Sequence, residues 1–258
     1  MKRLGKFLLV SLIAMALGHS AKAQQITVAA ATDLKYALTE IVNQFQQRYG
    51  TKVALTFGAS GNFFSQIQNG APFDLFFSAD EDFPKMLADL GMVDKSSLRT
   101  YAVGHLALWV PGTSLLDPIK LQMNLLTQPS VKRIAIANPQ HAPYGRAAMA
   151  ALEHYGLKDK VRDRLALGES VSQAAQFVQS GNAQAGLIAV SLAKSPVMSS
   201  SGKYWEVPGE AYPELKQAAG IVSRSMQKKA AQAFLDFVLS PEGGAVLKKY
   251  GLTPPTQQ

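Results

Sequence analysis

Short apolar runs alternate along the chain with segments whose apolar residues recur every three or four positions. Runs of about 4–8 residues are typical of buried strands, whereas the longer spacing is typical of helices that pack on one side. The expected strands are 26–30, 52–57, 74–77, 106–110, 133–137 and 185–190. The expected helices are 34–49, a short one carrying Phe63 and Ile67, 146–155, 171–179, 227–239 and 241–250. This alternation predicts βαβ units, and therefore an α/β fold with mostly parallel sheets and helices on both faces.

The first 23 residues have the pattern of a signal peptide. A basic start over 1–6 precedes an apolar stretch over 7–17 and the small residues of Ala21-Lys22-Ala23. The apolar stretch is shorter than a bilayer-spanning helix requires, so we expect cleavage before Gln24 rather than a retained anchor. No second long apolar run follows in the sequence. We therefore expect an exported protein in the periplasm.

Charge and cysteine content narrow the possible partners. The formal charge of +8 falls to +4 without residues 1–23, because four basic residues and no acidic residue lie there. The remaining Lys and Arg are dispersed singly or in pairs, without a basic stripe interleaved with aromatic residues. Nucleic acid is therefore not an expected partner. The absence of cysteine excludes disulfides, thiol catalysis, cysteine metal sites and a lipid-anchored cysteine.

Two enzymatic or metal-binding alternatives have weaker support in the sequence. Beyond the signal sequence the histidines are His105, His141 and His154, which lack the spacing of a metal motif. We expect no direct metal ligands, although a ferric site built from tyrosines and carboxylates stays an alternative. Gly58-Ala59-Ser60-Gly61 is not a nucleophile elbow. Because a triad assembles in space rather than in sequence, a serine hydrolase centred on Ser60 also stays open.

Four strand-to-helix junctions are rich in hydroxyls, small residues and free amides. They are Ala31-Thr32-Asp33, Gly58-Ala59-Ser60-Gly61, Ala142-Pro143-Tyr144-Gly145 and Gly168-Glu169-Ser170-Val171-Ser172. A helix N-terminus offers unsatisfied N–H groups and a partial positive charge, so several together form an anion site without Lys or Arg. Open α/β sheets bind ligands at the carboxyl ends of their strands, which is where these junctions are expected.

Three longer segments carry a family resemblance: 29–34, 70–80 and 138–145, which read AAATDL, GAPFDLFFSAD and NPQHAPYG. With them the chain resembles the periplasmic molybdate-binding proteins of ABC importers over essentially its whole length after residue 23. The resemblance implies a two-lobed periplasmic binding protein fold with two crossovers and the ligand in the interlobe cleft. Lobe one would comprise 24–103 and 212–258, and lobe two 104–211.

The resemblance also implies a function and its partners. The protein would be a non-enzymatic, monomeric carrier that binds molybdate or tungstate without a cofactor. It would deliver this cargo to a membrane permease with a cytoplasmic ATPase. Another oxyanion or ferric ion as cargo stays an alternative. Closure of the lobes would be a population shift driven by the ligand, and fully deprotonated oxyanions would be preferred.

The family's site residues are matched here one by one. The Thr32 hydroxyl, the Asp33 amide, the hydroxyl and amide of Ser60, and the backbone N–H groups of Tyr144 and Val171 would contact the anion. Some family members have a tyrosine hydroxyl where this chain has Ala189. Either Tyr144 supplies that hydroxyl, or the site makes fewer hydroxyl bonds.

The carboxylate of Asp33 would repel a dianion if it faced the site. We therefore expect it to cap the following helix while its N–H points to the anion. On this interpretation Asp33→Asn is tolerated, and a large gain in affinity on that change would contradict it.

Overall fold

Two five-stranded sheets form the framework of the protein. The computed structural model describes residues 25–255, so the signal peptide predicted over 1–23 lies outside the described residues. The strand orders are β2-β1-β3-β10-β4 and β7-β6-β8-β5-β9. The strands are β1 Gln25–Ala31, β2 Lys52–Gly58, β3 Leu75–Phe77, β4 Arg99–Gly104, β5 Leu106–Pro111, β6 Ile134–Ala137, β7 Leu165–Gly168, β8 Ala185–Ala189, β9 Gly202–Glu206 and β10 Leu215–Ile221.

The helices surround these sheets. They are η1 Thr32–Leu34, α2 Lys35–Tyr49, α3 Ser60–Gln68, α4 Asp82–Asp89, η2 Lys95–Ser97, α5 Pro118–Leu121, η3 Gln122–Thr127, α6 Pro143–His154, α7 Lys158–Val161, η4 Arg162–Arg164, α8 Val171–Gln179, α9 Val190–Ala193, α10 Pro196–Ser201, η5 Gly209–Ala211, α11 Lys228–Leu239 and α12 Pro241–Lys249. Among residues 25–255, no helix is long and apolar enough to cross a membrane.

Both sheets are mixed, with the same arrangement of directions. β1 pairs in parallel with β2 and β3, whereas β10 is antiparallel to both β3 and β4. In the second sheet β6 is parallel to β7 and β8, whereas β5 is antiparallel to β8 and β9. One strand in each sheet therefore opposes the other four, and the predicted α/β fold with mostly parallel sheets is confirmed.

The alternation of side chains along β1 explains why helices cover both faces of the first sheet. Ile26, Val28 and Ala30 belong to the core formed with α2, α11 and α12. Ala29 points the other way and packs with Phe63 and its neighbours on α3 and α4. Successive side chains of a strand point to opposite faces, so an uninterrupted apolar strand must be covered twice.

Most predicted elements agree with the structure to within one or two residues. The helix predicted over 34–49 is α2, and Gly50 ends it with φ 71° in the left-handed region that glycine adopts readily. Helix α6 begins at Pro143, three residues before the predicted start, because proline is well suited to a first helical turn. Strands β4, β7, β9 and β10 were not predicted.

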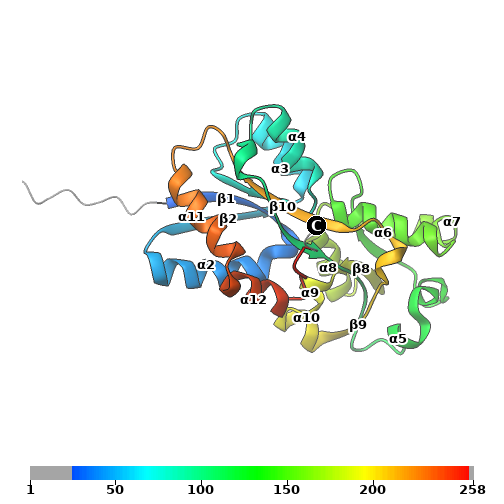
Figure 1. The fold of residues 1–258 in the computed structure, drawn as a ribbon. Helices are drawn as coiled ribbons and strands as arrows, with labels where there is room; N and C mark the ends of the chain where they lie inside the picture. Colours follow the sequence, from blue (N-terminus) through cyan, green and yellow to red (C-terminus); the bar gives the residue numbers. More distant parts are fainter. Residues whose placement is uncertain (1–24, 256–258) are drawn as a thin grey trace, which may run out of the picture.

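The chain passes between the two sheets twice. β4 of the first sheet leads directly into β5 of the second, and the chain returns from β9 to β10. Figure 1 shows the result: the blue-cyan and orange-red segments form one lobe, and the green-yellow middle of the chain forms the other. Both ends of the described part of the chain, 25–255, therefore build the same lobe.

Phe234 on α11 tests how far the first lobe depends on its aromatic core. Its ring is fully buried, with centroids 5.1 Å from Phe45 and 6.1 Å from Phe77. Phe234→Ala is expected to lower the free energy of unfolding by about 3–5 kcal/mol, since a cavity replaces the ring. Urea denaturation measures this change. Met226→Ala, at a position 91% exposed, is the control and should change it by less than about 0.5 kcal/mol.

Candidate functional site

A small cavity lies between the two lobes at the carboxyl ends of their strands. About 190 Å³ of empty space lies among its lining atoms, a figure that includes space open to solvent. Its walls come from the turns after β1, β2 and β3 in the first lobe and from the turns before α6 and α8 in the second. The lining residues are Ala31, Thr32, Asp33, Gly58, Ala59, Ser60, Ala79, Ala142, Pro143, Tyr144 and Val171. The structure thus brings together all five residues that the sequence predicted for the site.

Two lining hydroxyls have their acceptor side occupied by backbone amides. Ala79 N–H donates to Ser60 Oγ over 2.9 Å, within the first lobe. Ser172 N–H, from the second lobe, donates to Thr32 Oγ1 over 3.2 Å. Each hydroxyl therefore keeps its own proton for another acceptor, because a hydroxyl has one donor and can accept as well.

Three helices begin at the cavity and add backbone donors. Ser60, Tyr144 and Val171 lie in the first turns of α3, α6 and α8. Their N–H groups have no intrahelical acceptor at these positions, and none donates to another protein atom within residues 25–255. No Lys or Arg lines the cavity. The site therefore offers neutral hydrogen-bond donors and the positive ends of helix dipoles to an anion.

Asp33 does not cap the following helix, so that expectation is wrong. Neither η1 nor α2 has a side-chain cap, and Asp33 Oδ2 instead accepts a hydrogen bond of 2.7 Å from Gln217 Nε2. Its other oxygen, Oδ1, is buried without a partner in the described protein. Burial raises the pKa of Asp33 to about 6, and the bond from Gln217 is the largest of the contacts that oppose the rise. Its carboxyl belongs to an interior network rather than to the helix end.

This network joins the crossing strands to both lobes. The Tyr101 hydroxyl lies 2.9 Å from the Ser78 carbonyl oxygen and 2.9 Å from Gln217 Oε1. Gln217 Nε2 donates to Asp33 and, over 3.3 Å, to the hydroxyl of Tyr144 on α6. Burial raises the pKa of both tyrosine hydroxyls, which therefore stay protonated. The Tyr144 hydroxyl thus contacts this network, while the Tyr144 N–H lies at the start of its helix.

Sequence reasoning missed Tyr101, Gly104 and Gln217. Gln217 is the one polar side chain among the buried residues of β10, and a polar residue within this mostly apolar run is the signal that could have drawn attention to it. Gly104, at the end of β4, is required by close packing, because a Cβ atom there would overlap the Tyr144 hydroxyl and Gln217 Nε2.

Further contacts hold the lobes closed around the cavity. Gly61 N–H donates to the His141 carbonyl over 2.9 Å, and the Ser191 hydroxyl donates to the Asp33 carbonyl over 2.7 Å. At the edge, Arg146 on α6 pairs with Asp80 over 2.5 Å. These bonds join residues of different lobes, so the structure describes the closed arrangement.

Comparison with known proteins agrees with this geometry. Residues 26–253 match the family described as bacterial extracellular solute-binding protein. The chain belongs to this family. Its relatives include the molybdate-binding protein ModA of Azotobacter vinelandii, 38% identical over 95% of this chain and 96% of that protein. ModA of Rhodobacter capsulatus is 34% identical over 93% of this chain and 92% of that protein.

A solved structure extends the similarity to the fold of this solute-binding protein. The periplasmic molybdate-binding protein of Azotobacter vinelandii superimposes with a TM-score of 0.84 at 34% identity. The match covers 90% of this chain and all of that one. The two-lobed periplasmic binding protein fold is therefore confirmed.

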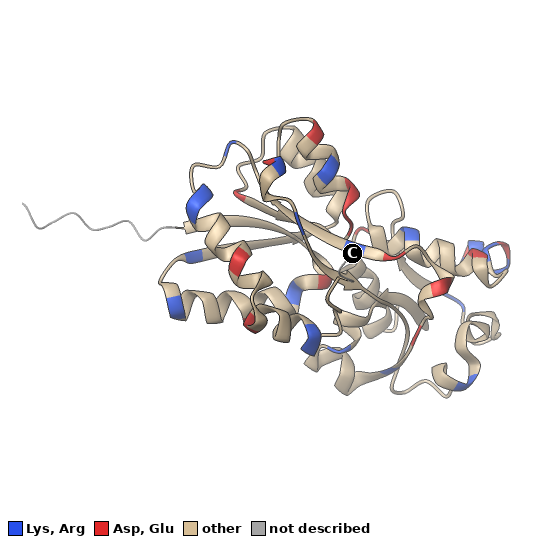
Figure 2. Ribbon diagram, viewed as in Figure 1, with Lys and Arg blue, Asp and Glu red and all other residues tan. Residues whose placement is uncertain are grey.

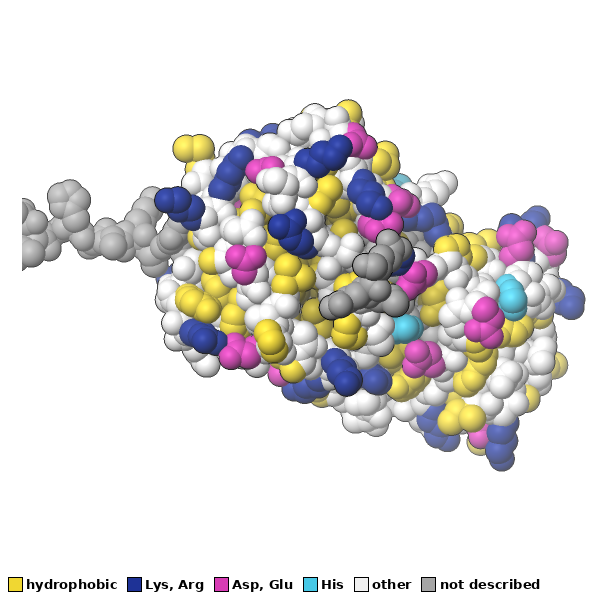
Figure 3. Space-filling model, in the orientation of Figure 1, with side chains coloured by type: hydrophobic (Ala, Val, Ile, Leu, Met, Phe, Trp, Pro, Cys, Tyr) yellow, Lys and Arg dark blue, Asp and Glu magenta, His cyan; other side chains and the backbone are white. Residues whose placement is uncertain are grey.

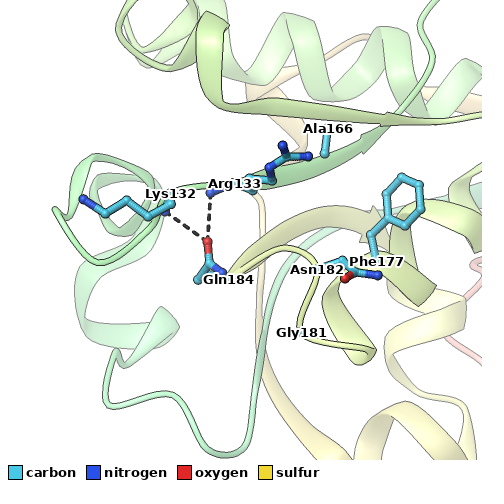
Figure 4. A pocket seen from close by; sticks show the side chains of 7 residues that line it. All are labelled: Lys132, Arg133, Ala166, Phe177, Gly181, Asn182 and Gln184. Carbon is cyan, nitrogen blue, oxygen red and sulfur yellow. Dashed lines mark hydrogen bonds between the residues drawn. The ribbon is translucent and has the colours of Figure 1, made fainter.

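The surface of the solute-binding protein has a larger hollow beside Lys132 and Arg133, with about 930 Å³ of empty space that includes space open to solvent. The hydrogen-bond donors that line this hollow do not point toward a common centre. Figure 4 shows the Lys132 side chain extending away from the other residues, and Gln184 Oε1 accepting from the backbone N–H groups of Lys132 and Arg133. Figures 2 and 3 show charges of both signs interspersed over the visible face. The interlobe cavity is therefore the better candidate for ligand binding.

Two alternatives find little support at the interlobe cavity. The Ser60 hydroxyl accepts from Ala79 N–H, and no histidine is hydrogen-bonded to it within residues 25–255, so no base is in place for a serine nucleophile in this arrangement. For a ferric site built from tyrosines, the lining residues supply one tyrosine, Tyr144. Ala189, where some family members have a tyrosine, is not among the lining residues. In the described part of the chain, no group of three or more His, Asp or Glu is placed to hold a metal ion.

The raised pKa of Asp33 gives the stability of the protein a definite pH dependence. Below pH 4 the carboxyl is protonated in both states, whereas between about 4 and 6 the folded protein retains the proton that the unfolded chain releases. The contribution of Asp33 to the free energy of unfolding therefore falls as pH rises through this window, by up to about 3 kcal/mol. Asp33→Asn should remove this loss, so the variant gains stability relative to wild type between pH 4 and 7. Urea denaturation at several pH values measures the difference; parallel profiles would contradict it.

Proposed function

We propose that this protein captures molybdate or tungstate outside the inner membrane and presents it to the permease of an ABC importer. The observation that supports this most is the set of neutral donors around a closed interlobe cavity without Lys or Arg. Relatives at 38% and 34% identity are named molybdate-binding proteins, which supports the choice of cargo. On this proposal the protein is an exported monomer, catalyses no reaction and needs no cofactor.

Each site residue has a definite role in the proposal. Thr32 and Ser60 donate through their hydroxyls, and Ser60, Tyr144 and Val171 donate through backbone N–H groups. Asp33 lies against the anion from the first lobe. The crossing strands support the proposed boundaries, 24–103 with 212–258 for lobe one and 104–211 for lobe two, because β4 ends at Gly104 and β10 begins at Leu215.

Binding replaces the hydration shell of a dianion by fixed dipoles. A hydrogen bond to a charged group contributes about 1.5–3 kcal/mol net, so several converging donors are needed to offset lost hydration. Donors from the two lobes reach the anion together only when the lobes are closed, so the ligand favours the closed state. A permease that recognises the closed lobes would then distinguish loaded from unloaded protein.

The same donor set is compatible with other tetrahedral oxyanions. Sulfate and phosphate present oxygen acceptors in the same geometry, and the size of the cavity would discriminate among them. A ferric ion needs anionic ligands, which a set of neutral donors does not supply.

Titration calorimetry of the chain from Gln24 tests the choice of cargo. We expect one-to-one binding of molybdate and tungstate that is much tighter than that of sulfate or phosphate. Preferential binding of sulfate or phosphate would retain the anion site but contradict the cargo. No heat with any of the four oxyanions would contradict the proposed function as a whole.

The role of the Ser60 hydroxyl can be measured with a variant. Ser60→Ala removes one donor to a charged group, so the dissociation constant for molybdate should rise by about 10- to 150-fold. Ser65→Ala on the same helix is the matched control, because Ser65 is exposed and donates only to the Gly61 carbonyl. Equal affinities of the two variants would contradict the role of Ser60. A thermal melt of each variant separates loss of binding from loss of folding.

A further inference from the structure

Asp33 is the one acidic residue among those that line the cavity, and its carboxyl group lies in the buried network behind the turn after β1. Asp33 is 1% exposed, and its Oδ1 has no hydrogen-bond partner in the described protein. An ionised carboxylate in this position would lie beside the bound dianion in a water-poor interior. Like charges at such short range strongly disfavour each other.

Within residues 25–255, no Lys, Arg or His forms an ion pair with this carboxyl. The groups that face it are neutral: Gln217 of β10, Tyr144 of α6, the backbone N–H groups of Asp33 and Leu34 and, through Gln217, Tyr101 of β4. From α9, Ser191 contacts only the Asp33 backbone carbonyl. The second buried carboxylate near the closure, Asp80, pairs with the guanidinium of Arg146. Asp33 therefore differs from Asp80 in having no counter-charge.

We propose that Asp33 binds the oxyanion as a neutral acid, so that closure around the dianion takes up one proton from solvent onto Oδ1. The protonated Oδ1 can then donate a hydrogen bond to an oxygen atom of the anion. The inference rests on the proposed function of the cavity. It makes Asp33 a residue that selects fully deprotonated oxyanions, because a neutral acid donates where a carboxylate would only accept.

The surrounding hydrogen bonds determine which carboxyl oxygen carries the proton. Gln217 Nε2 donates to Asp33 Oδ2, and the Tyr101 hydroxyl lies 2.9 Å from both Gln217 Oε1 and the Ser78 carbonyl oxygen. Oδ2 is therefore committed as an acceptor, and the proton goes to the unpartnered Oδ1. Burial, partly offset by hydrogen bonds of which that from Gln217 is the largest, raises the pKa of Asp33 to about 6, and a dianion beside it would raise the pKa further.

The sign of the pH effect follows from this linkage. Where Asp33 is ionised in the free protein and protonated in the complex, each binding event consumes a proton. The affinity then falls as pH rises, by up to about tenfold per pH unit. Above the pKa of Asp33 in the complex the dependence levels off.

Titration calorimetry with molybdate between about pH 6 and 8.5 tests the inference, since molybdate stays a dianion throughout that range. Repeating each titration in Tris and in a zwitterionic buffer of low ionisation enthalpy gives the number of protons taken up. We expect uptake approaching one proton per ligand and an affinity that declines with pH. Binding without uptake and with a constant affinity would overturn the inference while leaving the proposed function intact, whereas no binding at any pH would overturn both.

Asp33→Asn tests whether the proton in the complex lies on Asp33 or on the anion. The amide can accept from Gln217 through its oxygen and donate through its nitrogen, as the neutral acid does. We expect the variant to bind without proton uptake, with an affinity constant over this range and at least about tenfold above wild type at pH 8. If wild type takes up a proton and the variant loses binding, the anion carries the proton and Asp33 accepts it, which overturns the inference.

Asp80→Asn is the matched control, because it removes the other buried carboxylate of the closure. It should weaken binding through loss of the Arg146 pair but keep the proton uptake of wild type. Loss of uptake in this variant would assign the proton to Asp80 and overturn the inference. The carbonyl stretch of a protonated carboxyl in the infrared difference spectrum of wild type gives a readout that needs no variant, and its absence on binding would also contradict the proposal.

Discussion

The meeting of three helix N-termini at one buried cavity is the constraint around which this structure is arranged. Each first turn leaves N–H groups without an intrahelical acceptor, and such groups are costly to bury unless something accepts from them. In α3, α6 and α8 the groups at Ser60, Tyr144 and Val171 face a space shared by both lobes. On the proposed function, an oxyanion would provide the missing acceptors, which would link closure of the lobes to binding of the anion.

The crossing strands turn this local requirement into a property of the whole molecule. β4 and β10 pair with each other in the first sheet and lead to and from the second. Gln217 on β10 contacts Tyr101, Asp33 and Tyr144, so a single amide links the strand pair, the first-lobe turn and a helix of the second lobe. Glycine at position 104 lets the backbone pass close to this group. A change in lobe orientation must therefore alter the surroundings of Asp33.

A donor set without full positive charges suits a carrier that must release its ligand. Ion pairs with Lys or Arg would hold the anion in the open state as well, because they act at longer range than hydrogen bonds to dipoles. Short-range donors divided between two lobes lose most of their effect once the lobes separate. In the proposed mechanism Asp33 acts in the same way, because burial raises its pKa and opening of the lobes would reduce that burial.

The sequence by itself determined the elements and the identity of the junctions. Apolar periodicity located α2 and α8 closely, because a helix packed on one side must repeat its apolar residues every three or four positions. The small and hydroxyl residues of the junctions, including Thr32 and Ser60, marked the turns that line the cavity.

Only the tertiary structure decided what the side chain of Asp33 contacts. Local reasoning assigned it to a helix cap, because Asp next to a helix start usually accepts from that helix. The partner that it has, Gln217, is 184 positions away in the chain and reaches it through β10, a strand that periodicity did not predict. Short-range patterns specify elements, whereas a buried polar contact depends on which distant segments the fold brings together.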